Sequence, residues 1–159
     1  MKYEIVKMPE RLAAGISART DNHAADVGKV ISGLWDRFYR CGFYKGIPNK
    51  ADGKTIGLYT EYAGGADDPY TVMVCCAVTG EEIPGCELCR IPAGLYAKCI
   101  VACSMDKAAE KVAEAWQEIW KTKLPRAYIC DYEEYQNTGR EETEIHIYIG
   151  LKGDANVEI

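Results

Sequence analysis

The sequence predicts an α+β fold made of two tandem ββαββ units, one over residues 1–80 and one over residues 81–159, in a single domain of 159 residues. Each half contains strand-like segments ended by Pro or Gly and one long amphipathic segment, in the same order. Residues recur as well, and Pro9 matches Pro92. The spacing between matched positions shortens after the longer loop of the first half, as a difference in loop length within a repeated unit requires.

The first half opens with two predicted strands and a helix. Residues 3–8 alternate polar and apolar side chains up to Pro9, and residues 12–18 form the next strand. The segment TDN at residues 20–22 supplies capping side chains, so we predict a helix from there to about Cys41. Apolar residues recur every three or four positions and form one face of this helix. They are Val27, Val30, Ile31, Leu34, Trp35 and Phe38.

A loop and two further strands complete the first half. The loop spans residues 45–54 and is rich in Gly, Pro, Asn and Lys. Residues 55–62 and 70–78 are apolar enough for strands, and the segment AGGADDP between them favours a turn.

The second half repeats this order. Strands are predicted at residues 86–91 and 95–103 with Pro92 between them, and residues 104–106 cap a helix that ends near Thr122. Its apolar face has the same periodicity as that of the first helix. The face consists of Ala108, Val112, Ala115, Trp116, Ile119 and Trp120.

Two strands close the chain, at residues 126–135 and 144–151, after Pro125 prevents the helix from continuing. The turn between them is NTGREE. We therefore expect antiparallel sheets with one long helix for each unit, related by an approximate twofold axis. Because pockets favour interfaces between such units, we expect a ligand groove between the halves.

Composition and charge narrow the function classes. The content of 48% hydrophobic and 27% charged residues is that of an ordinary globular protein. A net charge of −5 with scattered Lys and Arg argues against direct contact with nucleic acid. No apolar run is long enough to span a bilayer, and the N-terminal segment does not resemble a signal peptide. We expect a cytoplasmic protein without membrane contact.

The eight cysteines do not predict a metal site. Most lie in apolar runs, where a thiol packs as a small hydrophobic group, and in a reducing cytoplasm we expect free thiols. Cys86 and Cys89 have C-x-x-C spacing, but a zinc site needs a second pair, and a strand would point these two side chains to opposite faces. No phosphate-binding glycine loop is present either, so we predict neither metal nor cofactor.

Glu133 is the leading candidate for a functional residue. It lies in the strand that begins as RAYIC, where Asp131 and Glu133 share one face and Tyr132 and Glu134 share the other. A carboxylate held among aromatic rings is costly unless something compensates its charge, and a ligand is one such group. In the other half the matched residue is Thr60, so the repeat does not account for this charge.

Four segments resemble GyrI-like effector-binding domains, the AraC-type domains found in multidrug-sensing transcription activators and as free-standing proteins. They are IPAGLYA at residues 91–97, IWKTKLP at 119–125, DYEEY at 131–135 and TEIHIYIGLK at 143–152. The resemblance implies a free-standing member with a duplicated fold and a groove between the halves. It places the central acid of the family on Glu133, facing an aromatic-lined pocket that accepts lipophilic cations. A position where some sensors carry a pocket aromatic is occupied here by Cys103.

The predicted site combines this acid with aromatic residues. Helical aromatics at core spacing pack against a sheet by default, but the indole N–H of Trp needs a partner, so we expect Trp35 and Trp116 at the groove. Strand tyrosines can present a ring to a ligand and a hydroxyl to Glu133, although core packing is an equal alternative. The predicted ligand-binding set is Glu133, Trp35, Phe38, Tyr59, Tyr96, Cys103, Trp116, Trp120 and Tyr148.

Three functions follow from this site. The first is binding of a planar, hydrophobic, cationic small molecule. The second is hydrolysis of reactive electrophilic compounds, which the resemblance allows, with Glu133 as general base and Tyr148 as proton donor. The third is inhibition of a protein partner such as a topoisomerase, which the family name suggests.

Overall fold

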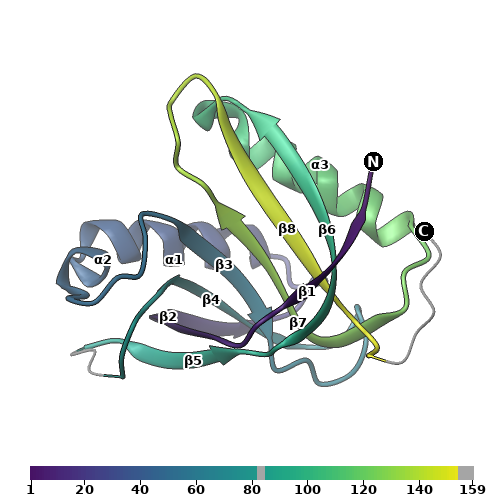
Figure 1. Cartoon of the computed structure of the whole chain (residues 1–159), viewed down its shortest axis with the longest axis horizontal. Helices are drawn as coiled ribbons and strands as arrows, with labels where there is room; N and C mark the ends of the chain where they lie inside the picture. Colours follow the sequence, from purple (N-terminus) through teal and green to yellow (C-terminus); the bar gives the residue numbers. More distant parts are fainter. Residues whose placement is uncertain (82–84, 154–159) are drawn as a thin grey trace.

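An eight-stranded antiparallel sheet forms the centre of the molecule, and the helices cover one of its faces (Figure 1). The computed structural model describes residues 1–81 and 85–153. The strands are β1 (Glu4–Met8), β2 (Arg11–Thr20), β3 (Thr55–Thr60), β4 (Tyr70–Ala77), β5 (Glu87–Ile91), β6 (Gly94–Cys103), β7 (Arg126–Tyr135) and β8 (Thr143–Leu151). The helices are α1 (Val27–Arg40), α2 (Phe43–Gly46) and α3 (Ala108–Lys121), with a 3-10 turn, η1 (Met105–Lys107), before α3.

The predicted α+β class and the order of strands and long helices are confirmed. Two details differ from the prediction. Helix α1 begins at Val27 rather than directly after residues 20–22, because the Asp21 carboxylate accepts a hydrogen bond from the backbone of His23 and holds a turn there. The expected loop after Gly42 also contains the short helix α2. Gly42 itself, with φ of 80°, adopts the left-handed conformation that ends α1.

The strands form one continuous sheet, where separate sheets for the two halves were expected. Their order is β1-β6-β8-β7-β3-β4-β2-β5. Each half gives its first strand to the other half, since β1 pairs with β6 and β5 pairs with β2. If each strand is exchanged for its counterpart in the other half, β1 for β5, β2 for β6, β3 for β7 and β4 for β8, the same order results when it is followed from the opposite edge of the sheet. A duplicated unit would produce this symmetry, and the duplication itself stays a prediction.

The register at the centre of the sheet shows which residue lies opposite Glu133, whereas the match between Thr60 and Glu133 as repeated positions stays a prediction. Strands β3 and β7 pair in antiparallel fashion, with Thr60 opposite Cys130 and Gly57 opposite Glu133. Because successive side chains alternate between faces, Thr60 and Glu133 point to opposite sides of the sheet. The residue that faces Glu133 across the ladder is therefore a glycine, which leaves space above the strand.

Apolar clusters lie on both faces of the sheet. Leu34 and Phe38 of α1 pack on β2 and β4, and Val112 and Ile119 of α3 pack on β6 and β8. A third cluster, around Tyr132, fills the face away from the helices. The two helices thus cover separate halves of one face, and the centre of that face lies between them. Among the described residues, no helix is both long and apolar enough to cross a membrane.

Candidate functional site

A cavity of about 670 Å³ lies between α1 and α3, above the central strands β3 and β7. Its walls are largely aromatic and aliphatic, and both helices and the sheet contribute. The main lining residues are Ile31, Trp35 and Tyr39 of α1, Val112, Trp116 and Trp120 of α3, and Tyr59, Glu133 and Tyr135 of the sheet. A mostly apolar cavity of this size with a few polar groups is typical of a small-molecule site.

The Glu133 carboxylate lies at the floor of this cavity and is held by three neutral donors. Trp116 Nε1 donates to Oε1 at 2.6 Å, and the Tyr59 hydroxyl donates to the same oxygen at 3.0 Å. The Tyr135 hydroxyl donates to Oε2 at 2.8 Å. Glu133 is only 3% exposed. The donors come from α3, β3 and β7, so the position of the carboxylate depends on the packing of both halves.

Burial raises the pKa of Glu133, while the hydrogen bonds from Trp116, Tyr135 and Tyr59 act in the opposite direction. The pKa values of Tyr59 and Tyr135 are raised as well, first by burial and then by the nearby negative charge of Glu133. Both phenols therefore remain protonated and serve as donors. No ion pair of the described residues involves Glu133, so its charge has no cationic partner in this part of the chain.

Aromatic contacts connect the acid to both helices. The Trp35 ring meets Tyr135 edge-on with centroids 5.0 Å apart, and Trp116 meets Tyr59 in the same way at 5.4 Å. These pairs fix the donors of Glu133 against the walls of the cavity. At the rim, Tyr39 and Trp120 are each 48% exposed, so the mouth presents large rings to solvent.

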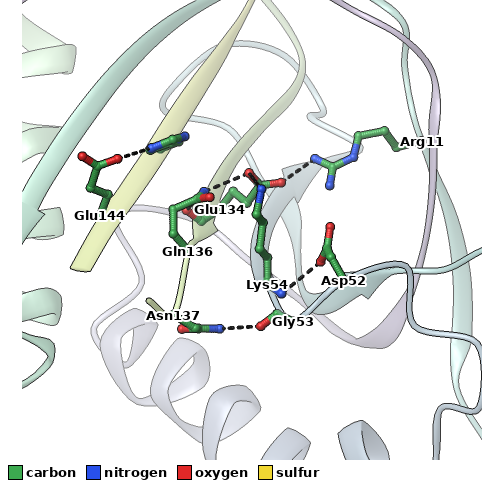
Figure 2. A network of polar contacts seen from close by, with 9 residues as sticks. Arg11, Asp52, Gly53, Lys54, Glu134, Gln136, Asn137 and Glu144 are labelled. Atoms are coloured by element: carbon green, nitrogen blue, oxygen red, sulfur yellow. Dashed lines mark hydrogen bonds and ion pairs between the residues drawn. The ribbon is translucent and has the colours of Figure 1, made fainter. Parts of the chain in front are cut away.

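The next residue, Glu134, is also a buried acid, but its carboxylate has a charged partner (Figure 2). It points to the other face of the sheet, where Arg11 Nη1 lies 2.8 Å from Oε2 and Gln136 donates to Oε1 at 2.9 Å. Burial alone would raise the pKa of Glu134, but the Gln136 hydrogen bond and the Arg11 charge outweigh it, and the pKa is lowered. Among residues 1–81 and 85–153, Glu134 therefore has a cationic partner and Glu133 has none.

Five residues of the predicted set line the cavity. They are Trp35, Tyr59, Trp116, Trp120 and Glu133. Their part in binding a ligand remains a proposal.

The other four do not line the cavity, and their predicted places at the site were wrong. Phe38 is fully buried beneath α1, because it lies three residues after Trp35 and turns toward the sheet. Tyr96 and Tyr148 belong to the cluster on the far face. Glu133 pairs with Ile147 in the ladder, so the neighbouring Tyr148 points away from it. Cys103 packs against the core beneath α3.

Sequence reasoning missed several lining residues. Tyr135 was foreseeable, because it lies two positions after Glu133 and therefore on the same face of β7. Tyr62 lies in the connection between β3 and β4, and Tyr70 is the first residue of β4. No local pattern places either residue at this cavity. Arg126 also lines it, although strand alternation alone would have put this residue on the other face.

Comparison with protein families assigns the chain. The model of Cass2, described as an integron-associated effector binding protein, matches residues 4–151. The chain belongs to this family. The resemblance to GyrI-like effector-binding domains is thereby confirmed, and membership supports binding of a small-molecule effector by this Cass2-type protein.

Two solved structures share the fold. An integron cassette protein from the mobile metagenome of Vibrio cholerae has 22% identity and a TM-score of 0.72, over 94% of this chain and 95% of its own. The protein SAV2435, solved with tetraphenylphosphonium bound, has 18% identity and a TM-score of 0.71, over 94% of each chain. Comparison with curated protein sequences gives no match.

Proposed function

We propose that this Cass2-type protein binds lipophilic aromatic cations in the cavity between α1 and α3, with Glu133 as the counter-charge. One observation carries the proposal: Glu133 is 3% exposed, and all three of its hydrogen-bond donors are neutral. A buried carboxylate without a cationic partner is costly. A ligand cation would restore the balance that Arg11 provides for Glu134.

The walls suit the same class of ligand. Trp35, Trp116 and Tyr59 surround the acid, and aromatic faces attract a desolvated cation by about 2 kcal/mol. The exposed rings of Tyr39 and Trp120 extend the apolar surface to the mouth. SAV2435, which shares the fold, was solved with a lipophilic cation, and this supports the choice of ligand class.

A thermal-shift and calorimetry panel tests the proposal with tetraphenylphosphonium, rhodamine 6G and, as a neutral isostere of the first, tetraphenylmethane carrying a solubilising hydroxyl. The wild type should be stabilised by the two cations and not by the neutral compound. Glu133→Gln keeps the shape of the side chain and should lose most of the shift. Glu141→Gln, an exposed turn residue, is the matched control and should behave as the wild type. Equal shifts for wild type and Glu133→Gln would overturn the role of the acid.

In the hydrolase alternative, Glu133 could still act as general base, but the predicted proton donor Tyr148 lies on the far face of the sheet. Three donors already occupy Glu133, and a carboxylate has about four acceptor sites, so little capacity is left to activate water. Binding is therefore favoured over hydrolysis. The topoisomerase-type partner, the absence of direct nucleic-acid contact and the cytoplasmic location stay predictions of the sequence.

A further inference from the structure

Arg126 brings a second charged group to the cavity that the proposed function does not use. It lines the cavity and is 8% exposed. Its Nη2 donates to Asp131 Oδ2 at 2.8 Å, and its guanidinium carbon lies 4.4 Å from the centroid of the Tyr128 ring. The guanidinium is thus held in one orientation by an ion pair and a cation–π contact.

A distortion of β7 places Arg126 on this face. Residues five apart in a regular strand point to opposite sides, so Arg126 and Asp131 would not meet. The register against β8 shifts between these two residues, and Tyr128 has φ of 53°. Gly150 lies against the distortion, and a Cβ there would be 2.4 Å from the Cys130 carbonyl oxygen. A non-glycine residue with positive φ is uncommon, and such residues cluster at functional sites.

The guanidinium has spare donor capacity, whereas the Asp131 carboxylate already accepts three hydrogen bonds and has little acceptor capacity left. Asp131 also accepts from the Tyr62 hydroxyl at 2.6 Å and from the Gly150 amide at 2.8 Å. In the described part of the chain, four buried side-chain atoms have no hydrogen-bond partner, and Arg126 Nε is the one that belongs to a cavity-lining residue. Such a group in a native structure calls for an explanation. Nε itself is enclosed, so an acceptor on a ligand would meet Arg126 through the part of the guanidinium that lines the cavity.

The charges along β7 then define the ligand. Asp131 and Glu133 are two residues apart on one face, so the Arg126–Asp131 pair lies roughly 7 Å along the strand from Glu133. The pair is neutral as a whole, and ionised Glu133 leaves one negative charge uncompensated. A ligand that suits both ends carries one positive charge, and its second polar group is uncharged.

We propose, on the basis of the binding function above, that the ligand is a lipophilic monocation carrying a neutral acceptor such as an ester or amide carbonyl, which Arg126 binds while Glu133 neutralises the cation. A carboxylate in place of the neutral acceptor is disfavoured, because Asp131 already neutralises the Arg126 charge. Arg126 is in this sense a residue that determines specificity within the same cavity.

Three probes that differ only at the end of one chain test the inference by calorimetry. They are butyltriphenylphosphonium, (3-methoxycarbonylpropyl)triphenylphosphonium and (3-carboxypropyl)triphenylphosphonium. The readout is the ratio of the dissociation constants in each protein. In the wild type the ester should bind about tenfold more tightly than the butyl compound, since a hydrogen bond to a charged donor is strong. The carboxylate should bind no more tightly than the ester.

Two variants assign the preference to Arg126. The double variant Arg126→Met with Asp131→Asn removes the ion pair without leaving a buried unpaired charge, and the ester-to-butyl ratio should fall to about one. Arg126→Lys keeps the ion pair and alters only the donor geometry, so it serves if the double variant does not fold, and it too should lower the ratio. The matched control, Arg40→Met with Asp36→Asn, removes the exposed ion pair of α1 and should keep the wild-type ratio.

Each other outcome overturns a distinct claim. Equal affinity of the wild type for the butyl and ester probes, with binding that still depends on Glu133, overturns the role of Arg126 and leaves the proposed function standing. Tighter binding of the carboxylate than of the ester overturns the neutral acceptor. Failure of the wild type to bind any of the three probes overturns both proposals.

Discussion

Gly57 lies directly opposite Glu133 in the ladder of β3 and β7, and a Cβ at Gly57 would be 3.1 Å from Glu133 Oε2 and 3.4 Å from Trp35 Cζ2. The absence of a side chain at this one position therefore leaves the space in which the carboxylate and the indole meet the cavity.

Gly57→Ala should displace the carboxylate and weaken binding of tetraphenylphosphonium by about tenfold, because overpacking of a tight contact costs about 1 kcal/mol or more. Calorimetry measures the affinity, and urea unfolding measures the stability. Gly33→Ala in α1 is the control, because a Cβ there meets nothing within 4 Å, and it should raise stability by about 0.5–1 kcal/mol without changing affinity. Unchanged affinity in Gly57→Ala would remove Gly57 from the site.

Tyr135→Phe should move the pH dependence of cation binding. A permanent cation binds the ionised form of Glu133, so affinity falls as the pH drops through the pKa of that carboxyl. Loss of the 2.8 Å hydrogen bond removes support from the ionised form, and the pKa rises further. The midpoint, measured by calorimetry between pH 4 and 8, should shift to higher pH.

Tyr148→Phe is the matched control for this experiment, because it also removes a tyrosine hydroxyl, but one that lies on the opposite face of the sheet. Its affinity and its midpoint should equal those of the wild type. A shift in Tyr148→Phe as large as that in Tyr135→Phe would mean that the two faces are coupled.

Glu133 and Glu134 should affect stability with opposite dependence on pH. The pKa of Glu134 is lowered in the folded state, so its contribution is present above the unfolded pKa of about 4.3 and is lost as the pH falls through the folded value. Glu134→Gln should therefore cost about 3 kcal/mol at pH 7, because Arg11 loses its partner, and this cost should shrink in acid.

For Glu133 the sign is reversed. Its pKa is raised in the folded state, so the folded protein holds the proton longer than the unfolded chain, and stability falls as the pH rises from about 4.3 through the folded pKa. Relative to wild type, ligand-free Glu133→Gln should gain stability over that rise. Urea unfolding of both variants between pH 3.5 and 8 checks the pair, and slopes of the same sign would contradict it.

Trp35→Ala and Phe38→Ala should separate the cavity wall from the core. Phe38 is fully buried, and its loss should lower the free energy of unfolding by about 3–5 kcal/mol. Trp35 lines the cavity and contacts Tyr135, so its loss should chiefly reduce affinity for tetraphenylphosphonium. Thermal unfolding and calorimetry on both variants decide, and equal loss of stability with unchanged affinity in Trp35→Ala would place Trp35 in the core.

Much of the fold followed from local pattern. Periods of about 3.6 and 2 residues marked α1, α3 and most strands, because hydrophobic side chains must reach the core from one face of each element. The same alternation placed Asp131 with Glu133 and Glu134 on the other side. Tyr148 was predicted at the site because the pairing of β7 with β8 was not known. With Ile147 opposite Glu133, the same alternation turns Tyr148 to the other face.

Only the tertiary structure decided which of the two acids has a cationic partner among the described residues, since that depends on whether Arg11 or a helix covers a given face. It also decided that Gly57 faces Glu133, and that a distorted β7 turns Arg126 toward the cavity. Sequence periodicity determines which side chains share a face. The register between strands distant in the chain, set by the packing of the whole sheet, determines what each face meets.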